Sequence, residues 1–575
     1  MNLKIKINKR DYSEYQLYHN DTNDEIKNVF DFYPTQHKLF NDDVFTYSEN
    51  EFHLVHSVIR SSKFIPGVVT FKKSFGNYNH KKLYKCIPDD KRLPIFLVPY
   101  TIKLGFSKKI DNIYVVFQFL EWKNKHPVGT IMNTVGPTCK LTAFYEYEMY
   151  CNCLYTSITS FSKNTMKALK RQTQNEYISD IFKKYNIEDR THVPNIYSID
   201  PDNSKDFDDA FHISKNISKN ISQNENETYL LSIYIANVTV WLDILDVWDS
   251  FSERISTIYL PDRKRPMLPN ILSDSLCSLQ EQEIRFVFCL DLSIQNGKII
   301  DHSFHSAGIK VCKNLRYDTN EMLKTEEYKQ LLELTNILNR TYKYGPNIKS
   351  CHQAVAYIMI LMNCFSAKKL LEMKGGVYRI LHTDHVPSEN LPQDIHNFAR
   401  GWYSSGCKYV SYESGQKADF NFRHDILELD SYVHITSPIR RLVDLLNMTC
   451  LMDGLGILPF SEKSLKCYNY WLSRIDYINK TMKSIRRIQN DCALLNKYSE
   501  NPELLCQEYS GFLFDKMCRN DGLYQYTVYI PEFKLVLKYV SNKEYDSFYK
   551  GMFKIYCFMS ENRLKHKIRL EMKNK

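Results

Sequence analysis

The chain has 575 residues, with 76 Lys and Arg against 66 Asp and Glu and a formal net charge of +10 at pH 7. This length predicts several domains, because one domain takes about 100–200 residues. The longest apolar run, residues 354 to 362, is too short to cross a bilayer, and the basic residues 1 to 15 lack the apolar run of a signal peptide. We therefore expect an intracellular, cytoplasmic protein without a membrane contact, with a nuclear location as the alternative.

The 16 cysteines are scattered and form no Cys-x-x-Cys pair, which favours reduced thiols over a zinc site or a disulfide framework. The 41 tyrosines and 32 phenylalanines occur among many basic residues. Aromatic faces stack on unpaired bases and basic groups contact phosphates, so this mixture is compatible with binding of single-stranded nucleic acid. The alternative is that A/T-rich coding enriches Tyr, Lys and Asn.

Residues 1 to 165 contain short β-rich runs broken by Gly and Pro, a pattern typical of small β-barrels. The pattern is weak before residue 80 and clearer after it, with β-rich runs at residues 95 to 98 and 113 to 119. Such barrels bind single strands through an aromatic and basic surface, and a barrel used only for packing is the alternative. Residues 165 to 190 have a helical period and many lysines, which predicts a helical connector.

Residues 198 to 210 read SIDPDNSKDFDDA and carry the less regular Asp202 and four further closely spaced acids. These four acids are Asp200, Asp206, Asp208 and Asp209. Because Pro and Asn cannot continue a central strand, we expect a strand followed by a loop. Carboxylates this close raise one another's pKa unless a cation compensates them, and Mg²⁺ prefers oxygen ligands. The pattern indicates a magnesium phosphodiesterase centre, and a solvated acidic loop is the alternative.

Residues 214 to 222 form a short polar repeat, which we expect to be an exposed hairpin insertion. Strands are predicted within residues 285 to 312 and again within residues 507 to 575. Helices are predicted at residues 325 to 340, 353 to 373 and 471 to 498. A further helix is predicted to begin at Pro438 with Ser437 as its cap, which would direct the positive end of the helix toward an anion.

Three motifs occur in one order along the chain. They are Asp-x5-Asp-x-Asp-Asp after a strand at residues 200 to 209, YLPDRKRPMLP followed by LSDSLCSL within residues 259 to 279, and Ser-Pro-Ile-Arg-Arg within residues 432 to 445. Together they resemble the ribonuclease II/R family over roughly residues 79 to 500. The run at residues 88 to 94 and a later Pro-x-Gly resemble the second cold-shock-type domain of the eukaryotic exosome-type branch of that family.

The resemblance implies an α+β multidomain fold, in which a central mixed α/β RNB catalytic domain is flanked by small OB-like β-barrels. The expected domains are a cold-shock-like barrel at residues 1 to 80, a second one at 81 to 165, the RNB domain at 166 to 506 and a C-terminal OB-type RNA-binding barrel at 507 to 575. Nothing at the N-terminus is long enough for the endonuclease domain that some exosome members add, so no endonuclease activity is expected.

The resemblance also implies roles for the acids and for one arginine. Asp200, Asp206, Asp208 and Asp209 fall on the family's catalytic acids and are expected to hold magnesium, with Asp200 and Asp209 as direct ligands and the other two at a second-metal or water-orienting position. Arg440 falls on the family arginine that contacts the scissile phosphate, which a planar, permanently charged guanidinium suits. A salt bridge at a helix terminus is the alternative for Arg440.

Three further residues are candidates for RNA binding. Tyr317 lies where the family has an aromatic residue that stacks on the terminal base, and Tyr259 is a second candidate for an aromatic lining of the channel. Arg441 follows the phosphate-binding arginine and could contact RNA beside it. Without the motif context, either tyrosine would more often be a core residue, because Tyr is abundant in this chain.

The resemblance implies a magnesium-dependent, processive 3′-to-5′ exoribonuclease that hydrolyses single-stranded RNA to 5′-mononucleotides. Its expected partners are single-stranded RNA and an exosome-like complex, with Mg²⁺ and no small-molecule cofactor. The chain departs from the family pattern around Asn237, Ala356 and Leu442, which bears on the clamp at the 3′ nucleotide and on the rate. A catalytically inactive RNA-binding scaffold is therefore the alternative, and a DNA exonuclease with the same metal chemistry is a third possibility.

Overall fold

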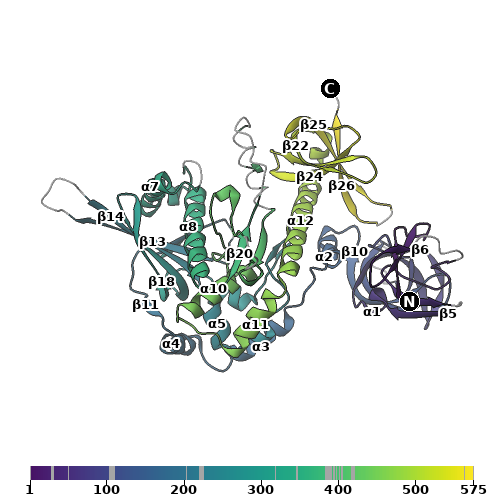
Figure 1. The fold of residues 1–575 in the computed structure, drawn as a ribbon, viewed down its shortest axis with the longest axis horizontal. Coiled ribbons are helices and arrows are strands. Elements are labelled where there is room, and N and C mark those ends of the chain that lie inside the picture. Colours follow the sequence, from purple (N-terminus) through teal and green to yellow (C-terminus); the bar gives the residue numbers. More distant parts are fainter. Residues whose placement is uncertain are drawn as a thin grey trace. The chain divides into compact units, whose positions relative to one another are not determined.

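The computed structural model describes the chain except for residues 1, 27–31, 49–50, 103–109, 203, 219–225, 318, 345–347, 383–391, 393–394, 396–397, 400–401, 403–405, 416–420, 562–563 and 574–575. The chain divides into two compact units (Figure 1). The barrel unit contains Met1–Tyr155, Leu260–Arg263 and Ser484–Lys575, and the central unit contains Thr156–Tyr259 and Lys264–Lys483.

The barrel unit begins with a five-stranded antiparallel sheet in the order β3-β2-β1-β4-β5. Its strands are β1 (Asn2–Ile7), β2 (Tyr15–His19), β3 (Glu25–Ile26), β4 (Val44–Ser48) and β5 (Glu51–His56), and the short helix α1 (Val58–Ser61) follows. Alternate side chains of β1, namely Leu3, Ile5 and Ile7, are buried in the core of this part. This alternation is the pattern of a strand with one face on a core.

The second sheet of this unit closes into a barrel in the order β10-β8-β7-β6-β9. Its strands are β6 (Ile65–Tyr78), β7 (Lys81–Pro88), β8 (Phe96–Tyr100), β9 (Ile113–Glu121) and β10 (Val128–Pro137). A Cβ atom on Gly67 or Gly129 would lie 2.9 or 2.7 Å from the Phe117 ring, so both glycines allow the strands to pack on that ring. The domain border predicted at residue 80 is wrong, because it separates β6 from its paired strand β7.

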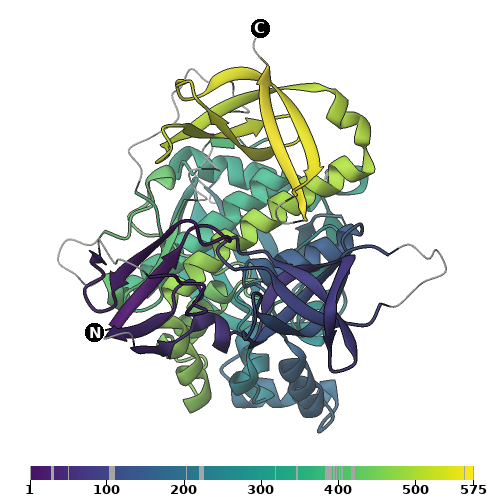
Figure 2. The same ribbon diagram turned by 90° about the vertical axis from the view of Figure 1, so that its right-hand side faces the viewer.

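The C-terminal part of the barrel unit is an antiparallel sheet in the order β24-β23-β22-β25-β26 (yellow in Figure 2). Its strands are β22 (Glu508–Cys518), β23 (Tyr524–Ile530), β24 (Leu535–Ser541), β25 (Tyr549–Met559) and β26 (His566–Lys573). Leu494 and Tyr498 of the long helix α12 (Ile475–Glu500) belong to the same core cluster as Tyr509, Leu513 and Phe553 of the sheet. The helix therefore contributes directly to the core of this sheet.

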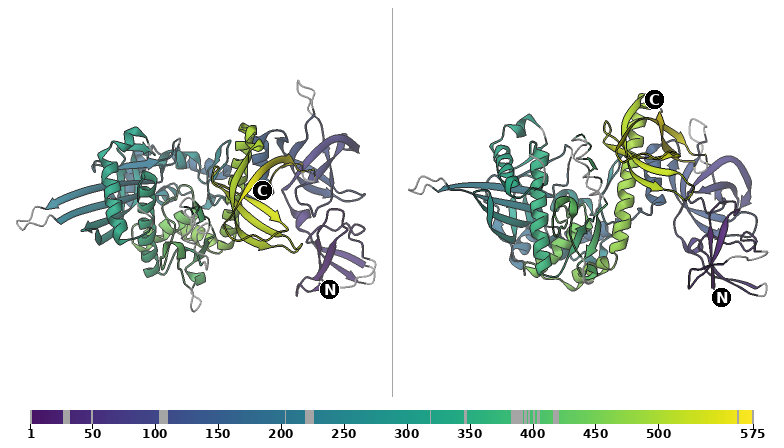
Figure 3. Two further views of the ribbon diagram at one scale, coloured as in Figure 1. Left: turned by 90° about the horizontal axis from the view of Figure 1, so that it is seen from above. Right: turned by 45° about the horizontal axis from the view of Figure 1, so that its top comes forward.

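The central unit is built on a seven-stranded mixed sheet in the order β11-β18-β17-β14-β13-β12-β19. Its strands are β11 (Glu188–Arg190), β12 (Tyr197–Asp200), β13 (Asp209–Ser218), β14 (Asn226–Ala236), β17 (Ile284–Gln295), β18 (Lys298–Lys310) and β19 (Lys313–Arg316). The β13–β14 hairpin extends from this sheet (Figure 3). It carries the predicted polar repeat, of which residues 219–222 lie outside the described residues.

Two small sheets and several helices complete the central unit. The small sheets pair β15 (Ile258–Tyr259) with β16 (Lys264–Arg265) and β20 (Val377–Ile380) with β21 (Lys408–Ser411). The helices are α3 (Thr159–Leu169), α4 (Gln174–Lys184), α5 (Val238–Ile244), α6 (Asn320–Leu323), α7 (Glu326–Thr341), α8 (Cys351–Glu372), α10 (Leu442–Gly454) and α11 (Glu462–Leu472). Helices α7 and α8 contact each other (Figures 1 and 3).

Helix α8 is, within the described part of the chain, long and apolar enough to cross a membrane. Its side chains at Ile358, Leu361 and Met362 are fully buried inside the central unit. A helix that is apolar on all sides and buried in this way has the character of a core helix.

Several helix predictions need correction. The single connector predicted at residues 165 to 190 is two helices, because Thr173 forms a capping box with Glu176 and begins α4. The domain border predicted at residue 165 falls inside α3. The helix predicted at residues 471 to 498 is also divided, since α11 ends at Leu472 and α12 begins at Ile475. The border between the compact units falls inside α12 rather than at residue 506.

Candidate active site

The four acids lie where strands β12 and β13 of the central sheet are joined. Asp200 is the last residue of β12 and Asp209 is the first residue of β13, so Asp206 and Asp208 belong to the loop between them. Strand β12 pairs in parallel with β19, with Asp200 opposite Arg316. Pro201 ends the strand as predicted, since it has no N–H to donate to a ladder. The strand-then-loop arrangement expected from the sequence is therefore present.

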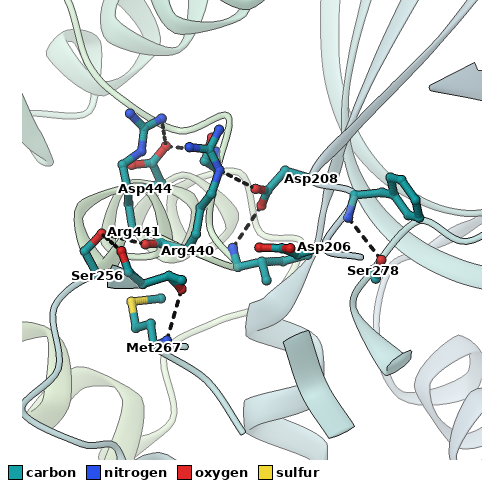
Figure 4. Close-up of polar contacts among 12 residues, drawn as sticks. Asp206, Asp208, Ser256, Met267, Ser278, Arg440, Arg441 and Asp444 are labelled. Atoms are coloured by element: carbon teal, nitrogen blue, oxygen red, sulfur yellow. Dashed lines mark hydrogen bonds and ion pairs between the residues drawn. The ribbon is translucent and has the colours of Figure 1, made fainter. Parts of the chain in front are cut away.

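Asp208 and Arg440 are joined by an ion pair, although 232 residues separate them in sequence. The Arg440 Nε donates to Asp208 Oδ2 at 2.9 Å, and the backbone N–H of Ile439 donates to Asp208 Oδ1 at 3.0 Å (Figure 4). The Asp208 side chain is 3% exposed, whereas the Arg440 side chain is 42% exposed. The acid is buried by the protein, while part of the guanidinium remains open to a ligand.

A neighbouring segment fixes the backbone of Arg440. The Thr257 N–H donates to the Arg440 carbonyl at 3.0 Å, and the Ser256 hydroxyl donates to the same oxygen at 2.9 Å (Figure 4). The Leu442 N–H in turn donates to the carbonyl of Ile255 at 2.9 Å. These bonds hold the arginine from the side opposite Asp208, so its guanidinium has a defined position.

The helix predicted to begin at Pro438 begins instead at Leu442, so Ser437 is not its cap. Asp444, at the third position of α10, accepts the Ser437 N–H at 2.8 Å and the Arg441 Nη2 at 2.8 Å. Residues 437–441 consequently form a turn, in which the Arg440 and Arg441 N–H groups donate to the Ser437 carbonyl. Arg440 approaches the acids from this turn, and the helix-terminus argument does not apply to it.

Arg441 has partners inside the protein. Its Nη2 contacts Asp444, and its Nη1 lies 3.4 Å from Nδ1 of the buried His434. Figure 4 shows the guanidinium directed at Asp444 rather than at Asp206 or Asp208. These contacts favour a structural role for Arg441, and its predicted contact with RNA stays a prediction.

Asp206 is engaged by two residues of the small β15–β16 sheet. Lys264 Nζ lies 3.0 Å from Asp206 Oδ1, and the Tyr259 hydroxyl donates to Asp206 Oδ2 at 3.0 Å. Lys264 also contacts Asp274 Oδ1 at 2.9 Å. Burial lowers the pKa of Lys264, but its bonds to Asp274 and Asp206 outweigh this effect and leave the pKa above its ordinary value. Tyr259 is 43% exposed, so its ring remains accessible.

Lys264 and Asp274 were not singled out by the sequence. Both lie in the second of the three motifs, and a lysine between two acid-rich segments was the available signal. Nothing in local spacing indicates that Lys264 would lie opposite Tyr259 in a two-stranded sheet and share its acceptor. That pairing is a property of the tertiary structure.

Asp200 and Asp209 differ from the other two acids. Asp200 is 9% exposed, and its Oδ2 is buried without a hydrogen-bond partner among the described residues. The pKa of Asp200 is raised to about 7, mainly by burial and also by the charge of Asp208, against the opposing effects of Ser198 and Arg440. Burial also raises the pKa of Asp209 to about 7, with the charge of Asp200 as the next cause. Burial raises the pKa of Asp208 to about 7 as well, against the opposing charge of Arg440. The raised pKa is therefore common to these three acids, and the feature particular to Asp200 is its unpartnered buried oxygen.

This donor set fits a divalent cation at one part of the cluster. The orphaned Asp200 oxygen and the neighbouring Asp209 carboxyl are hard oxygen ligands of the kind that Mg²⁺ takes. Asp206 and Asp208 are instead bound by Lys264, Tyr259 and Arg440. No three acid, His or Cys side chains of the described chain converge as a complete metal cage. The four predicted ligands thus form two pairs. Asp200 and Asp209 bind no Lys or Arg side chain of the described residues and are called the open pair, whereas Asp206 and Asp208 are already bound by protein groups.

Tyr317 lies beside the open pair. Its N–H donates to the Asp200 carbonyl at 3.0 Å, and its ring centroid is 5.4 Å from that of His352. Burial raises the pKa of the Tyr317 hydroxyl, and the charges of Asp209 and Asp200 raise it further. The structure therefore brings this tyrosine to the acids, and stacking on a base stays a prediction.

At Asn237 the chain departs from the family's sequence pattern, and the local contacts of this residue explain why an asparagine fits there. Its Oδ1 accepts the Val240 N–H at 3.3 Å at the start of α5, and its Nδ2 donates to Ser306 Oγ at 3.2 Å. Asn237 is fully buried. It acts as a helix cap inside the central unit, and an asparagine suits that position.

Comparison with known proteins identifies the central part of the chain. Residues 187–349 match the family model of the RNB domain. This part of the chain is similar to RNB domains. The RNB domain match includes all four acids, Lys264 and Tyr317, while Arg440 lies beyond the matched residues.

Known relatives support the same assignment. Exoribonuclease 2 of Vibrio vulnificus is 36% identical over 164 residues, which are 27% of this chain and 23% of that relative. The match thus spans less than a quarter of the length of that relative.

Solved structures extend the likeness to the fold around the RNB domain. RNase R of Mycoplasma genitalium, in complex with ribose-methylated single-stranded RNA, has a TM-score of 0.67 at 17% identity over 99% of this chain and 100% of that chain. Yeast Ssd1, described as a pseudonuclease, has a TM-score of 0.59 at 13% identity over 96% of this chain and 80% of that chain. The predicted α+β multidomain fold, an RNB domain with flanking OB-type β domains, is confirmed.

Proposed function

We propose that this protein is a magnesium-dependent, processive 3′-to-5′ exoribonuclease that hydrolyses single-stranded RNA to 5′-mononucleotides. The observation that carries the proposal is the ion pair between Asp208 and Arg440 beside Asp200 and Asp209. Phosphodiester hydrolysis needs positive charge on the phosphate oxygens and a site for the attacking water. Arg440 can place positive charge on the phosphate oxygens, and the carboxyls of Asp200 and Asp209 can provide the site for the attacking water.

Arg440 is suited to hold the scissile phosphate. Its bond to Asp208 uses Nε, and 42% of its side chain is exposed, so the outer edge of the guanidinium can donate to phosphate oxygens. Asp208 keeps the guanidinium in one orientation, and the backbone bonds from residues 256 and 257 limit its displacement. A pre-positioned charge needs no reorganisation when the transition state forms.

Asp200 and Asp209 are the residues that would hold Mg²⁺. When bound, such an ion supplies a Lewis acid and lowers the pKa of a bound water. Tyr317 lies close enough to the pair to limit access of bulk water and to meet the terminal nucleotide. The sequential removal of nucleotides from one end then depends on how the strand is held outside this cluster.

The assignment is tested with 5′-end-labelled single-stranded RNA incubated with Mg²⁺ or with EDTA. We expect progressive shortening and release of 5′-mononucleotides in Mg²⁺, and no cleavage in EDTA, because the open carboxyl pair then lacks its cation. An all-deoxy oligonucleotide of the same sequence is the matched control and is expected to remain intact, since it lacks the 2′-OH. Shortening that continues in EDTA would contradict the proposal.

The C-terminal sheet carries a candidate surface for single-stranded RNA. On β25 and β26, the register pairs Lys554 with Glu571, Tyr556 with Arg569 and Phe558 with Lys567. Tyr556 and Phe558 are 37% and 42% exposed. Aromatic rings with basic neighbours on one sheet face favour single-stranded nucleic acid, because rings stack on bases and cations contact phosphates.

Replacing Tyr556 and Phe558 together with alanine is expected to weaken RNA binding by about 30-fold or more, because each base–aromatic stack contributes about 1–3 kcal/mol and two are lost. Fluorescence anisotropy with a labelled oligoribonucleotide measures the Kd. Leu465→Ala, at an exposed apolar residue of α11, is the control and should leave the Kd unchanged. An unaltered Kd in the double variant would remove this surface from the proposed RNA path.

A catalytically inactive RNA-binding scaffold is the second candidate. Two observations favour it: Asp206 and Asp208 are bound by protein cations, and a protein described as a pseudonuclease shares the fold. The two candidates separate in one experiment, in which RNA retention on a filter is compared with mononucleotide release. Retention without release over the full range of Mg²⁺ concentration would establish the scaffold.

The finer placement in the family is also part of the proposal. The cold-shock resemblance supports the eukaryotic exosome-type branch, an exosome-like complex as partner and a cytoplasmic location. The proposed activity is exonucleolytic only. A closed circular RNA provides the check on endonuclease activity, because it has no 3′ end. We expect circular RNA to stay intact under conditions in which linear RNA is degraded.

A further inference from the structure

Lys264 lies within the acid cluster as a positive charge supplied by the chain itself. Its Nζ is 3.0 Å from Asp206 Oδ1 and 2.9 Å from Asp274 Oδ1. The three side chains are 23%, 11% and 23% exposed for Lys264, Asp206 and Asp274, respectively. The Lys264 ammonium is therefore partly shielded from solvent, together with the two carboxylates that it contacts.

Two features hold Lys264 in this place. In the β15–β16 sheet it lies directly opposite Tyr259, whose hydroxyl donates to the other oxygen of Asp206. On the far side, Asp274 belongs to the π-helical turn Leu272–Leu276, and its Oδ1 also accepts the Ser273 hydroxyl at 2.6 Å. A lysine fixed from both sides loses less freedom on contact with Asp206 than a flexible surface lysine would.

The consequence for Asp206 is that each of its oxygens already has a donor. An ion bound there would have to displace the Lys264 ammonium from Oδ1 and the Tyr259 hydroxyl from Oδ2. Asp208 is occupied in the same way by Arg440 and the Ile439 N–H. The buried Asp200 Oδ2, in contrast, has no partner among the described residues.

We propose that Lys264 fills the position of a second cation, so that the cluster takes about one divalent ion, at Asp200 and Asp209, instead of the two of a paired-metal site. This inference rests on the proposed function, since it concerns the metal complement of the same site. Lys264 is a positioning residue: it neutralises and orients Asp206 and does not touch the phosphate. The position of its charge is fixed by Asp274.

Counting bound ions tests the inference without RNA. Mn²⁺ serves as the probe, and electron paramagnetic resonance of the full-length protein titrated with Mn²⁺ reports free and bound metal. The wild-type protein is expected to bind about one Mn²⁺ per chain and Lys264→Met about two. Lys463→Met is the matched control, because Lys463 also bridges two carboxylates, Asp246 and Asp249, at 2.8 and 3.3 Å on an exposed surface. It should bind about one ion, like the wild type.

Each of the remaining outcomes supports or overturns the role proposed for Lys264. Two ions in the wild type, or one ion in a folded Lys264→Met, would overturn the role of Lys264 while the exonuclease proposal stands. No ion in the wild type would overturn both. Lys264→Arg keeps the charge and should keep the count at about one, which separates charge from shape. If Lys264→Met does not fold, Asp274→Asn provides the second variant. Without Asp274, Lys264 is expected to leave Asp206, and the number of bound Mn²⁺ ions per chain should rise. An unchanged number of ions would overturn the proposal.

Discussion

Replacing Asp208 with asparagine is expected to lower the rate of RNA hydrolysis by about 10²–10³-fold, with little change in RNA affinity. The amide keeps an oxygen for the Ile439 N–H but removes the negative charge that orients the Arg440 guanidinium. The arginine then has no fixed position toward the phosphate oxygens. Single-turnover degradation of an end-labelled oligoribonucleotide measures the rate, and anisotropy measures the affinity.

The control for this variant is Asp521→Asn. Asp521 also forms an ion pair with an arginine, Arg519, at 2.7 Å, but both side chains are exposed. Surface pairs contribute about 0–1 kcal/mol, so neither the rate nor the stability should change. A folded Asp208→Asn protein that degrades RNA at the wild-type rate would contradict the role given to the Asp208–Arg440 pair.

Magnesium is expected to raise the thermal unfolding midpoint of the protein, and by more at pH 8 than at pH 6. Asp200 and Asp209 have pKa values of about 7 in the fold, against an ordinary value of 3.8. The folded state therefore holds extra protons between about pH 4 and pH 7, and without metal its stability falls as the pH rises through this window. A divalent ion must displace these protons, so its apparent affinity should be about 100-fold lower at pH 6 than at pH 8.

The size of the effect follows from mass action. An ion present at 100 times its Kd stabilises the folded state by about 2.7 kcal/mol. In a domain of 150–250 residues this corresponds to a midpoint shift of about 5–11 °C, because each kcal/mol shifts the midpoint by about 2–4 °C. Differential scanning calorimetry at the two pH values, with Mg²⁺ and with EDTA, provides the measurement. The Asp200→Asn and Asp209→Asn double variant is the control, and it should show no shift at either pH. An equal shift at both pH values would argue against binding at these carboxyls.

The residue types around the acids were enough to predict that a strand is followed by a loop. Pro201 stops a strand whatever surrounds it, and Asp209 begins a run of residues that suit the next strand. The motif resemblance added Arg440, which no local pattern links to residues 200 to 209. In the structure the guanidinium forms an ion pair with Asp208, and its contact with a phosphate stays a prediction.

The errors concern features that tertiary contacts decide. Ser437 and Pro438 look like a helix start, but Asp444 takes the Ser437 N–H and delays the helix to Leu442. The border drawn at residue 80 cut a hairpin, because the sequence pattern is weak in the strand before it and strong in the strand after it. In the sequence, Lys264 cannot be distinguished from its basic neighbours. Its two acceptors, Asp206 and Asp274, lie 58 and 10 residues away, so no local pattern indicates these contacts.

The assembly of the centre from three distant segments has a consequence during protein synthesis. Residues 200 to 209 leave the ribosome first, residues 255 to 264 follow, and Arg440 arrives last. A nascent or prematurely terminated chain that ends before Arg440 can carry all four acids and Lys264, yet it has no guanidinium for the phosphate. Under the proposed function, the growing polypeptide therefore has no complete hydrolytic centre until most of its own length has been made.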